Sequence, residues 1–238
     1  MARIRMIGNE FYPARWRRAL AQHGRAQILD FLRGQEAFAL YRCLAEQLSW
    51  QLVAGGGDRS WISERGAYPD GAHYQKIAMR AHALAEHGHQ YLHDCYPPDE
   101  AMARSEDGSV LPVDAVPEYF NSAEFLGLAR ALTGDQQLAR VSAQAIRLRP
   151  GQFLLPEEPA AADDGRRYFY ALHLTPVWRA EWGGLLQALD DQGGVIETFL
   201  PRWNALSLFR LPQRHQVSLV APWAQRPQYA IGGWWLAE

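Results

Sequence analysis

The sequence contains little that would link it to a disulfide-rich scaffold, a membrane or a polyanion. Cys43 and Cys95 are the only cysteines in 238 residues, which excludes a multi-disulfide framework and a four-cysteine zinc site. No apolar run approaches the roughly 20 residues of a membrane-spanning helix, and the N-terminal residues lack the apolar centre of a signal peptide. The formal net charge of −2 argues against bulk attraction to nucleic acid or anionic lipid. We therefore expect a cytoplasmic protein with no nucleic-acid and no membrane partner.

Lysine is scarce as well, since Lys76 is the only one and the remaining basic residues are arginines. The arginines are scattered along the chain rather than gathered in a stripe, so their distribution does not indicate phosphate recognition. Hydrophobic residues make up 48% of the chain and charged residues 21%, which is typical of a folded globular domain.

The hydrophobic pattern changes character near residue 138. Before it, helical periodicity and capping residues predict helices over residues 13–21, 35–48, 74–86 and 122–132, with one short strand over 25–30 and a glycine-rich break at 55–57. After it, short apolar or alternating runs separated by Gly, Pro and Asp predict seven or eight strands. They lie over residues 143–148, 153–155, 168–174, 184–189, 205–209, 216–220 and 229–236. We expect a single α+β domain (residues 1–238), mainly β, in which a mostly helical layer (1–137) packs on a β core (138–238).

The most distinctive motifs lie in the second half of the chain. They are Arg149-Pro150-Gly151, Tyr170-Ala171-Leu172-His173-Leu174-Thr175-Pro176, Trp182-Gly183-Gly184, His215-Gln216-Val217 and Gln228-Tyr229-Ala230-Ile231-Gly232-Gly233-Trp234. In order and spacing they resemble the core of the prolyl 4-hydroxylase-like iron(II)/2-oxoglutarate dioxygenases, in particular the bacterial branch. This resemblance implies a double-stranded β-helix, a barrel of the jelly-roll or cupin type. It also implies iron(II) held by a His-x-Asp pair and a distant His, and 2-oxoglutarate anchored by an Arg or Lys on a late strand.

The positions that carry the family's chemistry depart from its pattern. His215 matches the distant histidine, but the His-x-Asp pair falls on Glu157-Glu158-Pro159. Proline has no side-chain atom that can bind a metal. The anchoring basic residue falls on Gln228, a neutral side chain that cannot form a charge-assisted fork with a carboxylate.

Two functional interpretations remain open. In the first, the protein is a catalytically degenerate dioxygenase that binds no cofactor tightly and acts as a binding or regulatory protein, with a protein or peptide partner at the barrel mouth. In the second, it is an active oxygenase that uses iron(II) and 2-oxoglutarate at a non-standard metal site formed by His215 and Glu157. Glu158, Asp163 and Asp164 lie near in sequence, although such an acidic stretch is typical of an exposed loop.

Several further residues are candidates for a functional site. Arg226 is an alternative 2-oxoglutarate anchor beside Gln228, although Pro227 disturbs the alternation that would place them on one face. A histidine cluster contains one pair with the i, i+4 spacing of helical metal ligands, but we favour ordinary packing and surface roles; its members are His82, His87, His89 and His93. Trp223 and Trp235 are the tryptophans expected at the surface, Cys43 is expected to be buried, and Cys95 to be near the surface. Substrate, partner identity and oligomeric state do not follow from the sequence.

Overall fold

The structure is a computed structural model that describes residues 7–8, 13–56, 59–64, 66–88, 90–96, 111–156 and 165–238. The helices are α1 (Pro13–His23), α2 (Gly34–Glu46), α3 (Gly71–Leu84), α4 (Val116–Phe120) and α5 (Ala123–Thr133), with 3-10 turns at Ala85–His87, Pro112–Ala115 and Ala180–Trp182. The strands are β1 (Arg25–Ile28), β2 (Gln51–Gly56), β3 (Arg59–Ile62), β4 (Tyr91–Tyr96), β5 (Leu138–Val141), β6 (Gln144–Leu148), β7 (Phe153–Leu154), β8 (Arg166–His173), β9 (Leu186–Leu189), β10 (Val195–Phe199), β11 (Ala205–Arg210), β12 (His215–Val217) and β13 (Gln228–Ala237). Within these ranges, no helix has the length and apolar character needed to cross a bilayer.

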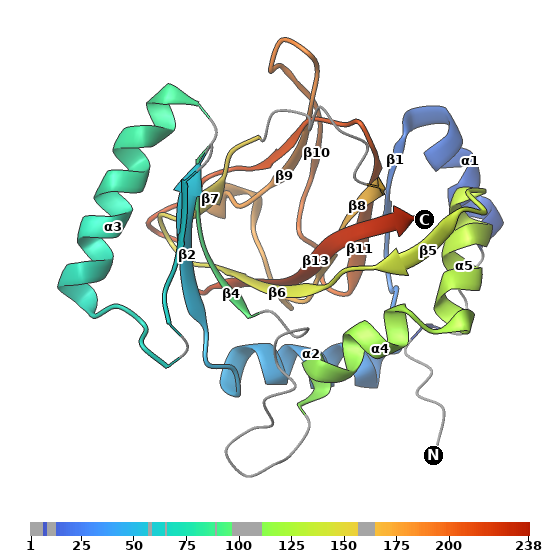
Figure 1. Cartoon of the computed structure of the whole chain (residues 1–238), viewed down its shortest axis with the longest axis horizontal. Coiled ribbons are helices and arrows are strands. Elements are labelled where there is room, and N and C mark those ends of the chain that lie inside the picture. Colours follow the sequence, from blue (N-terminus) through green and yellow to red (C-terminus); the bar gives the residue numbers. More distant parts are fainter. Residues whose placement is uncertain are drawn as a thin grey trace.

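The strands form one antiparallel sheet that curls into a nearly closed barrel (Figure 1). Its order is β1-β11-β8-β13-β6-β4-β7-β12-β9-β10, so that β11, β8, β13 and β6 form one wall and β7, β12, β9 and β10 the other. The two ends of this path are joined by side chains rather than by a strand ladder. Arg25 of β1 forms an ion pair with Glu197 of β10, and Gln27 Nε2 donates to the Leu200 carbonyl at 2.9 Å. This architecture confirms the predicted double-stranded β-helix.

Side chains along each strand point alternately into the barrel and outward, so they form two cores: one inside the barrel and one under the helices. Tyr170, Leu172 and Ile231 face outward and are buried with residues of α2 and α5. The neighbouring inward positions are smaller or aromatic, and Ala171 and Phe209 pack inside against the opposite wall. Because a strand exposes successive side chains on opposite faces, the apolar runs from residue 143 onward serve both cores at once.

Two of the expected helices show their sequence signals clearly. In α2, Ala37, Leu40, Cys43 and Leu44 form the buried stripe, which confirms the burial of Cys43. Helix α5 starts where the Ser122 hydroxyl accepts a hydrogen bond from the backbone N–H of residue 125 and ends at a left-handed glycine, residue 134, with φ of 80°. Figure 1 shows α2 and α4 beneath the β6–β13 wall and α3 beside β2.

The first half of the chain contains more β structure than its pattern predicted. Strands β2, β3 and β4 all pair into the sheet, and Gly55 and Gly56 lie inside β2 rather than in a break. Strands β5 and β10 were also missed. Cys95 is buried in β4, although the following prolines had indicated a position near the surface.

The two tryptophans expected at the surface differ. Trp223 is 66% exposed, which confirms the prediction, whereas Trp235 is fully buried and its surface assignment was wrong. Trp235 occupies an outward position of β13 and meets the rings of Phe125 and Tyr168 with centroids 5.8 and 6.1 Å away. Its burial follows from helix α5, which covers this end of the wall; the sequence of β13 alone does not contain that information.

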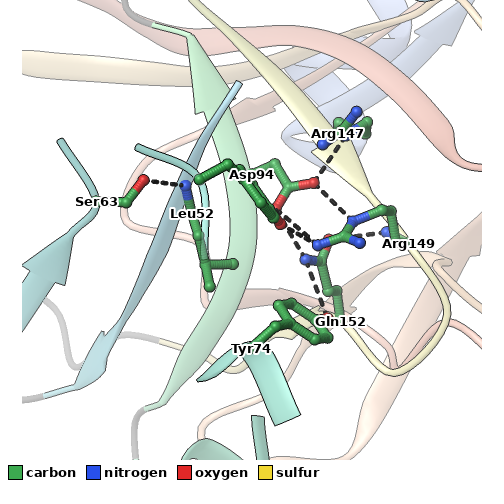
Figure 2. Close-up of polar contacts among 8 residues, drawn as sticks. Leu52, Ser63, Tyr74, Asp94, Arg147, Arg149 and Gln152 are labelled. Atoms are coloured by element: carbon green, nitrogen blue, oxygen red, sulfur yellow. Dashed lines mark hydrogen bonds and ion pairs between the residues drawn. The ribbon is translucent and has the colours of Figure 1, made fainter. Parts of the chain in front are cut away.

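A buried carboxylate stabilises the strand that joins the two walls. Strand β4 pairs with β6 of one wall and with β7 of the other. Asp94, in the middle of β4, is fully buried, and its carboxylate accepts hydrogen bonds from Arg147 Nε at 2.7 Å and Arg149 Nε at 2.9 Å. Its second oxygen accepts from the Tyr68 hydroxyl at 2.6 Å and from Gln152 Nε2 at 3.0 Å (Figure 2). The carboxylate therefore ties β4 to β6 and to the turn before β7.

Replacing Asp94 by Asn should destabilise the fold strongly, because two guanidinium groups would lose their shared counter-charge. Removing one partner of a buried ion pair costs about 3–5 kcal/mol, and we expect a loss of this size in urea-induced unfolding. The matched control is Glu197→Gln, which removes the half-exposed partner of Arg25 and should cost less than about 1 kcal/mol. Equal losses for the two variants would contradict the role assigned to Asp94.

Candidate functional site

The barrel interior holds His215, the residue that matches the distant metal-ligating histidine. His215 opens β12 and pairs with Ala188 of β9. Its ring lies 4.1 Å from the ring centroid of Phe169 and 5.8 Å from that of Phe209, both of which face inward. Trp234 of β13 lies 6.2 Å away on the same side. His215 is therefore held among aromatic rings inside the barrel. Glu157, its predicted neighbour, lies outside the described residues, as do Glu158, Pro159, Asp163 and Asp164.

A backbone contact determines which nitrogen of His215 carries a proton. Nδ1 lies 2.9 Å from the carbonyl oxygen of Gln213. Because a carbonyl oxygen only accepts, Nδ1 must be the protonated nitrogen, and Nε2 is the atom through which this imidazole acts chemically. Metal-ligating histidines are commonly oriented by such an N–H to carbonyl contact. The backbone contact of His215 is therefore of the kind that orients such histidines.

Gln228 occupies the position where the resemblance implies a cationic anchor. It is the first residue of β13, lies opposite Leu148 of β6 and is 4% exposed. Its Nε2 donates to the carbonyl of Gly184 at 2.9 Å. Gly184 has a φ of +60°, and a Cβ at this residue would lie 2.6 Å from that amide nitrogen. The Gln228 amide is therefore hydrogen-bonded to backbone, at a place where only glycine fits opposite it.

Arg226 does not share the interior position of Gln228. It precedes β13, is exposed, and its guanidinium carbon lies 5.9 Å from the ring centroid of Trp182. The guanidinium is thus at the surface and stacks on an aromatic ring.

A polar row inside the barrel was not found by sequence reasoning. His173 Nε2 lies 3.1 Å from the Ser207 hydroxyl, which also accepts a hydrogen bond from Gln27 Nε2 at 3.1 Å. Because Ser207 already accepts from Gln27, its own O–H is available to donate to His173 Nε2. His173 Nδ1 is buried and lacks a hydrogen-bond partner among the described residues. Burial lowers the pKa of His173 to about 4, so this imidazole is neutral at physiological pH.

The described residues do not supply the donor set that the resemblance implies for metal and co-substrate. In the ranges that the structure describes, no three His, Cys, Asp or Glu side chains come together as a metal-binding group. Of the three positions expected to bind iron, Pro159 cannot do so by its chemistry. At the co-substrate end, the described interior residues His173, Ser207 and Gln228 are all uncharged. A dicarboxylate would meet no cationic partner among them.

The histidine cluster is dispersed in the fold. His82 is on α3 with Nε2 2.7 Å from the Gly151 carbonyl, His87 is exposed, and His93 is buried in β4. The i, i+4 spacing of His89 and His93 is not that of one helix, because His93 belongs to a strand; His89 lies outside the described residues.

Comparison with known proteins shows what the second half of the chain resembles in sequence and what the whole chain resembles in fold. Residues 143–236 match the family model of the 2OG-Fe(II) oxygenase superfamily. A prolyl-4-hydroxylase of Pseudomonas putida has a TM-score of 0.57 at 17% identity, with 95% of this chain and 100% of that chain covered. For a prolyl hydroxylase of Trichoplax adhaerens the TM-score is 0.59 at 14% identity, with 94% and 89% covered. At such identities the structural likeness shows the fold alone.

One curated relative adds a likeness in sequence. Prolyl 3-hydroxylase OGFOD1 of Xenopus laevis is 33% identical over 78 residues, which are 30% of this chain and 15% of that enzyme. The matched segment thus spans a small part of the frog enzyme's length. Together these findings confirm the predicted resemblance to the prolyl-hydroxylase-like 2OG-Fe(II) oxygenases.

Replacing His173 by Gln should reduce the loss of folding stability that the protein suffers at acidic pH. The pKa of His173 is lowered to about 4 from 6.5, so between these values the unfolded chain binds more protons than the folded one. Stability therefore falls as the pH drops through this window, by at most about 3 kcal/mol for one such group. In urea unfolding at pH 7 and pH 4.5, the variant should lose less stability than the parent. The control His87→Gln changes an exposed histidine and should not alter the loss; the same behaviour for both variants would refute the assignment.

Proposed function

We propose that this protein retains the 2-oxoglutarate oxygenase barrel as a binding or regulatory module and has lost the family's iron-dependent oxygenation. The observation that carries the proposal is Gln228. It is a buried neutral side chain, hydrogen-bonded to the Gly184 carbonyl, at the position where the family resemblance implies a cation. A carboxylate placed there would be desolvated without a charged partner, which is unfavourable.

The sequence at the predicted metal-binding pair supports the same conclusion. Glu157-Glu158-Pro159 replaces His-x-Asp, so one ligand is removed outright and another changes from nitrogen to oxygen. With His215 as the only unchanged ligand, most of the coordination energy of an iron(II) site is lost. We accordingly propose that neither iron(II) nor 2-oxoglutarate binds tightly.

The proposed partner is a protein or peptide at the barrel mouth. The relatives are prolyl hydroxylases, and the Trichoplax adhaerens structure is a complex with a hypoxia inducible factor peptide fragment. A barrel that keeps this fold keeps a scaffold on which peptide recognition occurs in a relative. The cytoplasmic location remains an inference from composition.

A second candidate function is an active oxygenase with a non-standard metal site at His215 and Glu157. One observation favours it: the Gln213 carbonyl holds His215 in the tautomer that a metal ligand requires. This contact is equally expected in a protein that has retained the strand geometry of its family after losing the other ligands. We therefore rank it second.

The unmodified protein should bind 2-oxoglutarate at millimolar concentration or weaker, with or without iron(II) or manganese(II). Loss of one member of a buried charge pair costs about 2–5 kcal/mol, and loss of chelation to the metal adds to this cost. A total loss of about 4 kcal/mol or more turns a micromolar affinity of about 8 kcal/mol into a millimolar or weaker one. Isothermal titration of the protein with each metal and with 2-oxoglutarate measures both affinities. Succinate formation that disappears in His215→Ala would establish the second candidate instead.

The combined variant Glu157→His, Pro159→Asp and Gln228→Arg should gain metal-dependent 2-oxoglutarate binding. It restores the donor atoms and the cation on a barrel whose strands are already in place. The matched control carries Pro159→Ala in place of Pro159→Asp, so that it lacks only the carboxylate ligand, and should bind metal more weakly. Circular dichroism establishes whether the triple variant folds. If it folds but binds metal and 2-oxoglutarate no better than the parent, the substituted positions are not the cause of the weak binding.

A further inference from the structure

A charged cluster on the outer face of the sheet lies apart from the barrel interior. Arg147 and Arg149 both direct Nε at the same oxygen of the Asp94 carboxylate, at 2.7 and 2.9 Å. Tyr68 donates to the other oxygen, and burial together with the nearby Asp94 raises the pKa of this phenol, which keeps it protonated. Two guanidinium groups and one carboxylate therefore leave an excess of one positive charge.

The arginines retain hydrogen-bond donors that the protein does not use. Arg147 donates through Nε alone, and its two terminal nitrogens have no partner in the part of the chain that the structure describes. Arg149 donates through Nε and Nη2, to Asp94 and to the Tyr68 hydroxyl, which leaves Nη1. None of these nitrogens is among the buried polar atoms without a partner, and the two side chains are 20% and 28% exposed. The unused donors consequently face solvent.

Aromatic rings hold both guanidinium groups in place. The guanidinium carbon of Arg147 lies 4.9 Å from the ring centroid of Trp50, and that of Arg149 lies 4.5 Å from Tyr74 and 5.1 Å from Tyr68. Gln152, which is fully buried, holds Asp94 through Nε2. Figure 2 shows Arg147, Arg149 and Gln152 converging on the Asp94 carboxylate. Because these contacts order the arginines in advance, a ligand would bind with little loss of side-chain entropy.

A purely structural ion pair would not need the second arginine. One guanidinium balances the charge of Asp94, whereas the second shares the same carboxylate and leaves one positive charge without a counter-charge of its own in the cluster. The two terminal nitrogens of Arg147 can donate to two oxygens of one planar or tetrahedral anion. Arginine is suited to such paired hydrogen bonds because its guanidinium group is planar.

We propose that Arg147 and Arg149 form a binding site for a compact oxyanion, the carboxylate or phosphate group of a ligand. The site lies where Arg149 contacts Tyr74 of α3, next to Arg147 on β6, and is independent of the chemistry inside the barrel. The excess positive charge selects an anion, and the aromatic frame directs it to the outward edge of the guanidinium groups.

Calorimetric titration at constant ionic strength tests this site with two probes, inorganic phosphate and glutarate. Glutarate lacks the keto group with which 2-oxoglutarate chelates iron, so its binding does not depend on a metal. Whichever probe binds more tightly shows whether the site prefers a phosphate or a carboxylate. Arg147→Gln should weaken binding by roughly tenfold or more, because it removes charge-assisted hydrogen bonds. The matched control Arg42→Gln removes the same charge from an exposed position of α2 and should bind as the parent does.

Two results would overturn the proposal. One is that the parent protein binds neither probe, and the other is that Arg147→Gln and Arg42→Gln bind alike. Circular dichroism establishes whether Arg147→Gln folds. If it does not, Arg147→Lys keeps a cation beside Asp94 but removes the planar fork, and it should bind several-fold more weakly. Unchanged affinity in the folded Arg147→Lys variant would show that these arginines only stabilise the sheet.

Discussion

The hydrogen bonds to the buried carboxylate of Asp94 are the interaction on which the joining of the two walls of this barrel depends. Strand β4 is the element that touches both walls, through β6 and through β7. A charged residue at the centre of such a strand is tolerable only if its charge is met, and Arg147 and Arg149 meet it from β6 and the following turn. The same contacts position the end of β6, where Leu148 pairs with Gln228, and the start of β7. The geometry of the interior thus depends on an ionic cluster outside it.

Inside the barrel, the scaffold of the oxygenases that this chain resembles is present, while the proposed change concerns its chemistry. The inward rings of Phe169, Phe209 and Trp234 still surround His215, and the strand ladders that carry the motifs are complete. Among the polar groups of the interior, His173, Ser207 and Gln228 are nevertheless neutral, and they hydrogen-bond to one another or to backbone. Ladder pairing is made by backbone atoms and does not depend on which side chains face inward, so a barrel can persist after its ligands change.

The sequence predicted those parts of the fold whose signals are local. Helices α2 and α5 carry apolar stripes and end residues that need no distant partner, and the strands from β6 to β13 alternate clearly, with β10 as the exception. Strands β2 and β4 were missed because polar residues such as Gln51, His93 and Asp94 occupy buried positions. Their burial is explained by partners far along the chain, with Asp94 and Arg147 separated by 53 positions. Motif spacing in the sequence was sufficient to identify His215 and Gln228 as site candidates. The row of His173, Ser207 and Gln27, in contrast, arises only when β8, β11 and β1 come together.

The central proposal is that the barrel does not hold the metal and co-substrate used by the 2OG-Fe(II) oxygenases that it resembles. The most direct measurement is anomalous diffraction from crystals of the unmodified protein grown with manganese(II) and 2-oxoglutarate. The account predicts no ordered metal on Nε2 of His215 and no 2-oxoglutarate between His215 and Gln228. A strong anomalous peak at Nε2, with 2-oxoglutarate chelated to it, would contradict the account and show that the protein is an oxygenase with an altered set of ligands.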